Sequence, residues 1–206
     1  MEKPSRQLIY HIVLPVIVTV LVMMIGTIII VPPMVRNNVE SSVHSSSLST
    51  LAQFKALRGY YTEYVVKKVT TGSSLEPSFD HVGNPNRIPL PATMIHDLSL
   101  LMEKGEGVSL KLYSVYPFPN RLGRHLDSFQ SNAWTVLGVR PNDIVSDVLQ
   151  IGDRTVMRVA IADIMQVQAC VDCHNSHPLS PKTNWELGDV RGVLEIDTDS
   201  TEQVAL

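Results

Sequence analysis

The chain has 206 residues, of which 44% are hydrophobic and 18% charged, and its formal net charge is −3. This length allows one domain of ordinary size and a short additional element. A slightly acidic chain without a basic patch is not expected to bind nucleic acid.

The first long element is apolar. Residues 12–31 read IVLPVIVTVLVMMIGTIIIV and contain no charge. As an α-helix this segment spans about 30 Å, enough to cross the hydrocarbon core of a membrane. A secretory signal has a shorter apolar region and a small-residue cleavage site, which this chain does not show. We therefore predict an N-terminus at 1–11 and an uncleaved transmembrane helix at 12–32.

The charges on either side of this helix predict its orientation. Lys3 and Arg6 precede it, whereas Arg36 is followed by no further Lys or Arg until Lys55. The positive-inside rule then puts the N-terminus in the cytoplasm and the rest of the chain outside. In a Gram-negative bacterium this means the inner membrane, with the exported part in the periplasm.

Residues 33–49 are polar and serine-rich and are predicted to form a stalk. In the segment that follows, Phe54, Leu57, Tyr61 and Tyr64 recur at helical spacing. A helix that leaves the membrane would continue through this segment. We therefore expect either a homodimer paired through the stalk helix or a place in a larger membrane complex.

The remaining segments alternate between helical and strand patterns. Residues 71–92 hold four prolines and are predicted to be a loop. After them we predict a helix ending at Gly105 or Gly107, a strand, a second helix, a hairpin turning at Gly152, and a last strand. The ranges of these five elements are 92–107, 108–120, 124–138, 143–165 and 188–198. The order predicts an α+β fold in which an antiparallel, PAS-like sheet has flanking helices.

The two cysteines of the chain stand in the sequence CVDCH at 170–174. A dithiol redox centre would need a βαβ setting, which the pattern does not show. Zinc needs four ligands, and Cys173 and the adjacent His174 cannot easily share one tetrahedron with Cys170 and His177. The spacing is that of covalent haem attachment: two thioethers from Cys170 and Cys173, with His174 as the proximal iron ligand. The sequence therefore predicts one covalent haem c.

Residues 50–197 also resemble a known family. The resemblance is carried by FKALRGYYTEYVVKK, NPNRIPLPATMIHDLS, YSVYPFPNR and RVAIADIMQVQACVDCHNSHPLSPKTNWELGDVRGVLEI. They are similar to the bacterial extracytoplasmic c-type haem PAS-like sensor domain, which occurs alone or ahead of cyclase, diguanylate cyclase or histidine kinase outputs. The resemblance implies a haem-bearing PAS-like fold and a sensory role. It leaves 198–206 as a C-terminal tail.

The second axial ligand of the iron is left open. Some relatives use a cysteine, but both cysteines here are assigned to thioethers. Met94 and His96 are the leading candidates, because they begin a helix that would face the pocket. The remaining alternatives are an iron without a second protein ligand, or ligation by Tyr60, Tyr61, His81 or His44.

Other residues are expected around the porphyrin. Arg191, on the strand after the motif, could form a bidentate pair with a haem propionate. Arg58 and Tyr61 are weaker candidates for the same role. Trp185 would pack on the porphyrin edge or in the core.

Two functions fit these expectations: a redox or diatomic-gas sensor, and a tethered monohaem cytochrome that carries electrons for, or forms an accessory subunit of, a membrane complex. The first suits the sensor portion of a longer receptor and the second a chain that acts alone. A peroxidase would need an acid–base residue such as His81 or His96, which nothing in the sequence demands. We therefore expect no enzyme.

Overall fold

The computed structural model describes residues 9–201. It confirms the predicted α+β class, with one long apolar N-terminal helix, a four-stranded antiparallel sheet and flanking helices. Residues 1–8, with Lys3 and Arg6, and residues 202–206 of the predicted tail lie outside the described part. Two compact units are distinguished, one ending at Ser42 and the other running from Val43 to Thr201.

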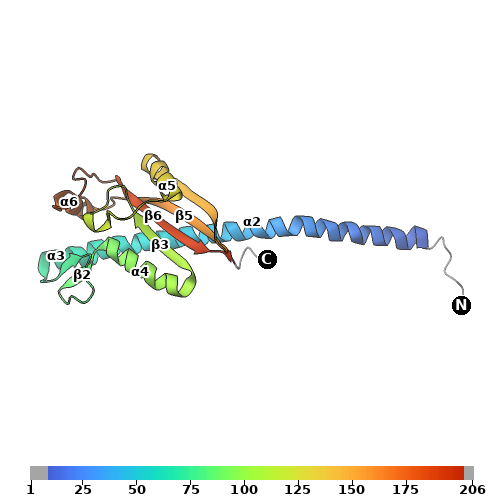
Figure 1. Ribbon diagram of the computed structural model, residues 1–206, viewed down its shortest axis with the longest axis horizontal. Coiled ribbons are helices and arrows are strands. Elements are labelled where there is room, and N and C mark those ends of the chain that lie inside the picture. Colours follow the sequence, from blue (N-terminus) through green and yellow to red (C-terminus); the bar gives the residue numbers. More distant parts are fainter. Residues whose placement is uncertain (1–8, 202–206) are drawn as a thin grey trace. The chain divides into compact units, whose positions relative to one another are not determined.

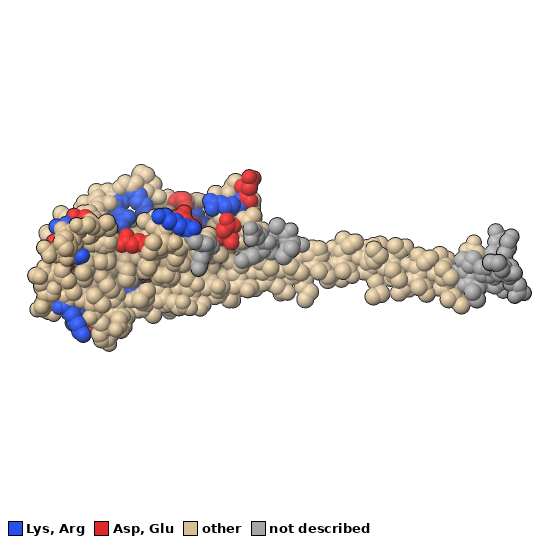
Figure 2. Space-filling view, turned by 90° about the horizontal axis from the view of Figure 1, so that it is seen from below, with Lys and Arg blue, Asp and Glu red and all other residues tan. Residues whose placement is uncertain are grey.

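The first unit is the apolar helix. A short π-helix, η1 (Ile9–Val13), leads into α2 (Leu14–Tyr61). The hydroxyls of Thr19 and Thr27 each donate to the backbone carbonyl four residues earlier, so neither is left unpaired on an apolar surface. By length and composition the helix can cross a membrane, and its apolar window is unburied. From the side shown in Figure 2, no charged side chain lies along this apolar part. The helix is compatible with a membrane anchor.

In the second unit, α2 packs on the sheet. Val43, Ser47 and Leu51 are buried at intervals of four residues and so form one helix face. The hydroxyls of Ser47 and Thr198 share a hydrogen bond of 3.2 Å, which ties this face to the last strand. Two short helices continue the chain beyond α2: η2 (Thr62–Val66) and α3 (Lys67–Gly72).

The sheet has the order β3-β6-β5-β4, and all its neighbouring strands are antiparallel. The bounds are β3 (Val108–Tyr113), β4 (Ile144–Ile151), β5 (Arg154–Ile164) and β6 (Val190–Asp199). β6 is an inner strand of the sheet. Its successive side chains face opposite sides of the sheet, and helices cover both sides. Val193, Leu194 and Ile196 are accordingly almost completely buried.

Helices cover both faces of the sheet (Figure 1). On one face α5 (Ser128–Val139) contributes Phe129, Ala133 and Leu137 to a core with Ala160, Ala162 and Val193. On the other face lie α2, from Val43 onward, and α4 (Pro91–Glu106), which packs against β3. Asp127 starts α5 with a capping box, in which its side chain accepts from Gln130 N–H and its own N–H is bonded by the Gln130 side chain.

The structure confirms the predicted helices, hairpin and last strand after residue 92, but the predicted strand 108–120 ends at Tyr113, and Pro119–Arg121 form a 3-10 helix instead. It also corrects one segment before residue 92. Gly107, with φ of 63°, ends α4, and Gly152, with φ of 62°, lies in the turn between β4 and β5. The predicted loop 71–92 contains two parallel strands, β1 (Glu76–Ser78) and β2 (Arg87–Pro89). Strands of three residues are too short to produce a recognisable alternation in sequence.

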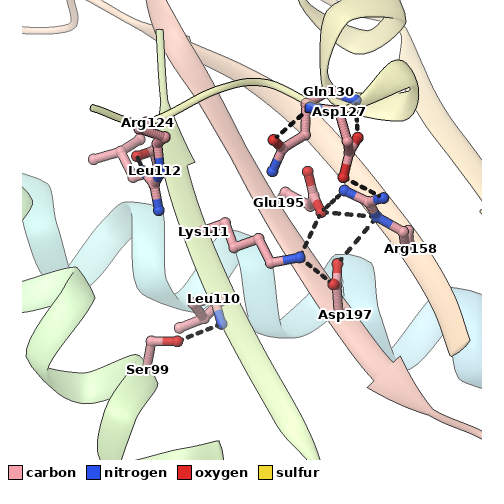
Figure 3. Close-up of polar contacts among 10 residues, drawn as sticks. All are labelled: Ser99, Leu110, Lys111, Leu112, Arg124, Asp127, Gln130, Arg158, Glu195 and Asp197. Atoms are coloured by element: carbon pink, nitrogen blue, oxygen red, sulfur yellow. Dashed lines mark hydrogen bonds and ion pairs between the residues drawn. The ribbon is translucent and has the colours of Figure 1, made fainter. Parts of the chain in front are cut away.

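A buried ionic network lies between α5 and the sheet (Figure 3). Arg158 donates to Oε1 of Glu195 from Nε (2.9 Å) and Nη2 (2.6 Å), and to Oδ2 of Asp127 from Nη1 (2.9 Å). Lys111 lies 3.4 Å from Glu195 Oε1 and also pairs with Asp197. Burial, followed by the hydrogen bond and charge of Asp197, raises the pKa of Glu195 to about 7. The network links the cap of α5 to strands β3, β5 and β6.

Candidate functional site

The cysteine motif forms a helix, α6 (Gln168–Ser176), between β5 and β6. The sequence patterns did not predict this helix. Residues three and four apart share one helix face, so Cys170, Cys173 and His174 lie together. Both thiols are free, that of Cys170 half-buried and that of Cys173 exposed. One short helix therefore presents two sulfurs and an imidazole side by side.

The geometry disfavours a dithiol redox centre, one of the two alternatives to haem. β5 and β6 are antiparallel neighbours, so α6 is not the crossover helix of a parallel βαβ unit. Burial raises the pKa of the half-buried Cys170 thiol, whereas thiol–disulfide exchange centres have lowered thiol pKa values. Among the side chains that the structure describes, no group of three or more His, Cys, Asp or Glu is arranged to hold a metal ion.

His174 is held between an arginine and an aromatic ring. Arg191 of β6 donates from Nε to Nδ1 of His174 at 3.3 Å. The ring of Phe118 lies 5.5 Å from the imidazole, centroid to centroid, and 5.2 Å from the ring of His177. Burial, followed by the charge of Arg191, lowers the pKa of His174 to about 4. The imidazole is therefore neutral at neutral pH, which is the form that binds a metal.

An ion pair lies beside Cys170. Arg58, on α2, pairs through both terminal guanidinium nitrogens with the carboxylate of Asp163, near the end of β5. The charges of Arg58 and Asp163 act in opposite directions on the pKa of the Cys170 thiol, which burial raises. Arg58 thus lies next to the motif, with its charge already compensated by Asp163.

Trp185 packs behind the motif. It forms a buried cluster with Met165 and Val171, and Cys170 packs against this cluster. The side chain of Asn175 accepts from the backbone N–H of Trp185 at 2.8 Å and donates to its carbonyl at 2.9 Å. These two bonds fix the tryptophan relative to α6.

These groups fit a covalently attached haem. The two thiols and the imidazole on one face of α6 match the attachment that the motif predicts. Trp185 is 3% exposed, and among the described residues its Nε1–H has no acceptor. Lys182 and Arg191 both lie near the Trp185 ring. Cations and a buried N–H beside the motif suit the two carboxylates that a haem carries.

Met94 and His96 both lie near the start of α4. Burial, followed by the charges of Arg121 and Arg124, lowers the pKa of His96 to about 4. His96 is therefore neutral at neutral pH and lies near the segment after β3, which includes η3 (Pro119–Arg121) and Phe118. Both residues remain predicted ligands of the iron.

The other predicted residues have different surroundings. Tyr61 donates from its hydroxyl to the carbonyl of Pro89 at 2.8 Å. His81 and Asp97 share a hydrogen bond of 2.9 Å. Tyr60 is exposed and packs on Tyr64, and His44 is half-buried on α2. Their roles toward a haem stay predictions.

Sequence reasoning missed Phe118, Asp163, Asn175 and Lys182. Phe118 was read as the end of a strand, and its contact with His174 joins segments far apart in the chain. Asp163 was read as one residue of a hairpin strand, although it pairs with a residue of α2. A local pattern carries no signal for such pairings.

Comparison with known proteins places the chain in a family. The family model described as Tll0287-like, Tll0287, matches residues 36–198. This is a haem-binding, sensor-like family associated with c-type haem. No curated protein and no solved structure matches the chain. Since the match covers the sheet, its flanking helices and the cysteine motif, the chain belongs to the Tll0287-like family.

Proposed function

We propose that this chain is a membrane-anchored, periplasmic c-type haem protein that serves as the input domain of a redox or diatomic-gas sensor. The observation that carries the proposal is the face of α6 formed by Cys170, Cys173 and His174. Two free thiols and a neutral imidazole stand there at the spacing of covalent haem attachment. Membership of a family associated with c-type haem supports the same cofactor.

The residues have distinct roles in this proposal. Cys170 and Cys173 hold the haem by thioether bonds, and His174 holds its iron. When bound, the haem supplies an iron that can change oxidation state or take a diatomic ligand. Before the haem is attached, the hydrogen bond from Arg191 and the packing of Phe118 restrict the orientation of the His174 ring. Met94 or His96 would be the second ligand of the iron, unless that position is left to a gas, and Arg191, with Arg58 and Tyr61 as weaker candidates, would bind the propionates.

Contacts between the motif and its neighbours support a sensory role. Arg58, which pairs with Asp163 beside Cys170, belongs to the same helix, α2, as the apolar segment. Phe118 contacts the ring of His174, and Tyr116 of the same segment contacts Trp134 of α5. A rearrangement at Asp163 would change a contact of α2, and one at His174 would act on α5 through this segment. A signal shifts this equilibrium only by favouring one of the two arrangements.

The membrane anchor and its orientation are part of the proposal. The apolar part of α2 has the length and composition of a membrane-spanning helix. Lys3 and Arg6 favour a cytoplasmic N-terminus, which leaves the motif in the periplasm. Covalent haem attachment takes place on that side of the membrane. The exposed side chains Leu57 and Tyr60 on α2 offer a surface for a homodimer or for a subunit of a membrane complex.

A tethered monohaem cytochrome is the second candidate. It is favoured by the exposure of Cys173, because electron exchange with a partner needs an attachment site close to the surface. Neither candidate requires an enzyme activity or nucleic acid binding.

Absorption spectra of the detergent-solubilised chain, produced in cells that attach haem, test the proposal. A Soret band that shifts with CO or NO supports gas sensing. A six-coordinate iron that ignores CO but cycles between oxidation states supports redox sensing or electron transfer. Met94→Leu and His96→Ala, with Met102→Leu as a control on the same helix, identify the second ligand. Absence of a Soret band in denatured protein contradicts the proposal.

A further inference from the structure

Trp185 has an unusual environment for a buried tryptophan. Its side chain is 3% exposed, and its Nε1–H has no hydrogen-bond acceptor in the described part of the chain. Indole nitrogen can only donate, and a buried donor without an acceptor has lost its hydrogen bond to water without a replacement. More than about 90% of buried polar groups in proteins have a partner. This N–H therefore indicates an acceptor that the described residues do not supply.

The position of Trp185 is fixed with respect to the haem motif. Asn175, the residue after His174, holds both the backbone N–H and the carbonyl of Trp185. The cluster that contains Trp185 packs directly against Cys170. The acceptor is thus required next to the two residues that attach the haem.

The charges around the ring specify the chemistry of the acceptor. Lys182 places Nζ 3.8 Å from the centroid of a Trp185 ring, and Arg191 places Cζ at 5.3 Å. Asp189 accepts from Lys182 at 3.4 Å, but this carboxylate is also bonded to the backbone N–H of Glu186. Two cations and an N–H donor at one place are complementary to a carboxylate.

We infer that Trp185 and Lys182 form a propionate-binding subsite of the haem, in which Trp185 Nε1–H donates to the carboxylate and Lys182 supplies the counter-charge. This inference rests on the proposed covalent haem. It adds Lys182 to the residues that the sequence suggested around the porphyrin, and it gives Trp185 a polar role in place of simple packing.

The test uses the two tryptophans of the chain, Trp134 and Trp185. In a Trp134→Phe background, ultraviolet resonance Raman spectra report the hydrogen bond of the Trp185 indole alone. The indole band sensitive to this bond is expected at lower wavenumber in the haem-loaded chain than in a Cys170→Ala, Cys173→Ala chain. An identical band position in the two chains overturns the inference.

Variants provide a second readout. Trp185→Phe and Lys182→Gln should keep the covalent haem but leave the propionate charge less compensated. This favours ferric iron and should lower the ferrous-to-ferric ratio at a fixed applied potential about three- to tenfold, the range of one hydrogen bond. Trp134→Phe is the control and should leave the ratio unchanged, and Lys182→Arg should restore most of it.

The outcomes separate this inference from the proposed function. If the wild-type chain carries haem but both Trp185→Phe and Lys182→Gln keep its ferrous-to-ferric ratio, the subsite is refuted and the haem stands. If the wild-type chain carries no haem, the proposed function itself fails. If Trp185→Phe does not fold, Lys182→Gln and the Raman measurement still test the propionate-binding subsite.

Discussion

Arg191 and His174 share a direct hydrogen bond, with Nε of the arginine 3.3 Å from Nδ1 of the histidine. An arginine N–H can only donate, so Nδ1 is the acceptor and the neutral ring carries its proton on Nε2. A histidine that binds metal through Nε2 normally donates its Nδ1–H to a partner. Arg191 would therefore have to leave Nδ1 if iron were bound at Nε2, and it would then be available to a propionate.

The first prediction concerns the charge of Arg191. Arg191→Leu removes a half-buried cation beside His174, and a nearby cation favours ferrous over ferric iron. The reduction potential of the haem should therefore fall, by about 60 mV if the lost interaction is about 1.4 kcal/mol. Arg191→Lys should lower the potential less. Arg154 is an exposed arginine near Asp199, and Arg154→Leu should not change the potential. An unchanged potential in Arg191→Leu would show that the charge of Arg191 does not act on the haem.

The second prediction concerns the ionic network of Figure 3. Arg158→Leu leaves Glu195 buried without its main partner. Loss of one partner of a buried pair should lower the free energy of unfolding by about 3–5 kcal/mol, measured by urea unfolding in detergent. Arg140→Leu, which breaks an exposed pair with Asp143, should cost less than about 1 kcal/mol.

A double variant checks this explanation. If the cost of Arg158→Leu comes from the uncompensated charge of Glu195, adding Glu195→Leu should recover part of the lost stability. If the stability losses of the two single substitutions simply add in the double variant, the cost of Arg158→Leu comes mainly from lost packing, such as the contact of Arg158 with the Phe129 ring.

The third prediction is a pH dependence. Burial, followed by Asp197, raises the pKa of Glu195 from 4.5 to about 7. Between these values the folded state holds a proton on Glu195 that the unfolded state has lost, so stability falls as pH rises. The stabilisation from this group is complete below pH 4.5 and is lost as pH rises through 7. Relative to Glu195→Gln, the wild-type chain should lose up to about 1.4 kcal/mol per pH unit in this window.

The same titration with Glu103→Gln, on the exposed surface of α4, is the control and should run parallel to the wild type. A wild-type curve parallel to that of Glu195→Gln between pH 5 and 7 would show that Glu195 has an ordinary pKa.

The fourth prediction concerns the close approach of two strands. A Cβ added at Gly192 would lie 2.7 Å from the backbone oxygen of Tyr113. Gly192→Ala should therefore force β3 and β6 apart and cost about 1–3 kcal/mol of unfolding free energy. Gly138→Ala is the matched control, since no atom lies within 4 Å of its added Cβ, and it should stabilise α5 by up to about 1 kcal/mol. Equal effects of the two substitutions would contradict this account.

The fold could be predicted where the chain carries local signals. β5 is apolar along most of its length, β6 contains the apolar run Val193–Leu194, Gly107 and Gly152 adopt positive φ at the ends of their elements, and residues 12–31 carry no charge. α6 was not predicted, because its nine residues are mostly polar and show no clear helical period of apolar side chains. The parallel pair β1 and β2 was too short to detect.

In the candidate site, too, some residues could be predicted from local sequence and others could not. Cys170, Cys173 and His174 could be identified because the chemistry of the attachment fixes their spacing. The contacts of His174 with Phe118, of Arg58 with Asp163 and of Trp185 with Asn175 join separate segments. Such contacts follow from tertiary packing, so no local pattern could give them.

The central claim is that haem is covalently joined to Cys170 and Cys173, and the intact mass of the denatured chain tests it most directly. The chain should be produced in cells with haem attachment machinery, together with His177→Ala as a control that keeps the attachment. We expect the wild-type and control chains to carry the mass of one haem, and the Cys170→Ala, Cys173→Ala chain to show the bare polypeptide mass. A bare polypeptide mass for the wild-type chain would contradict the account.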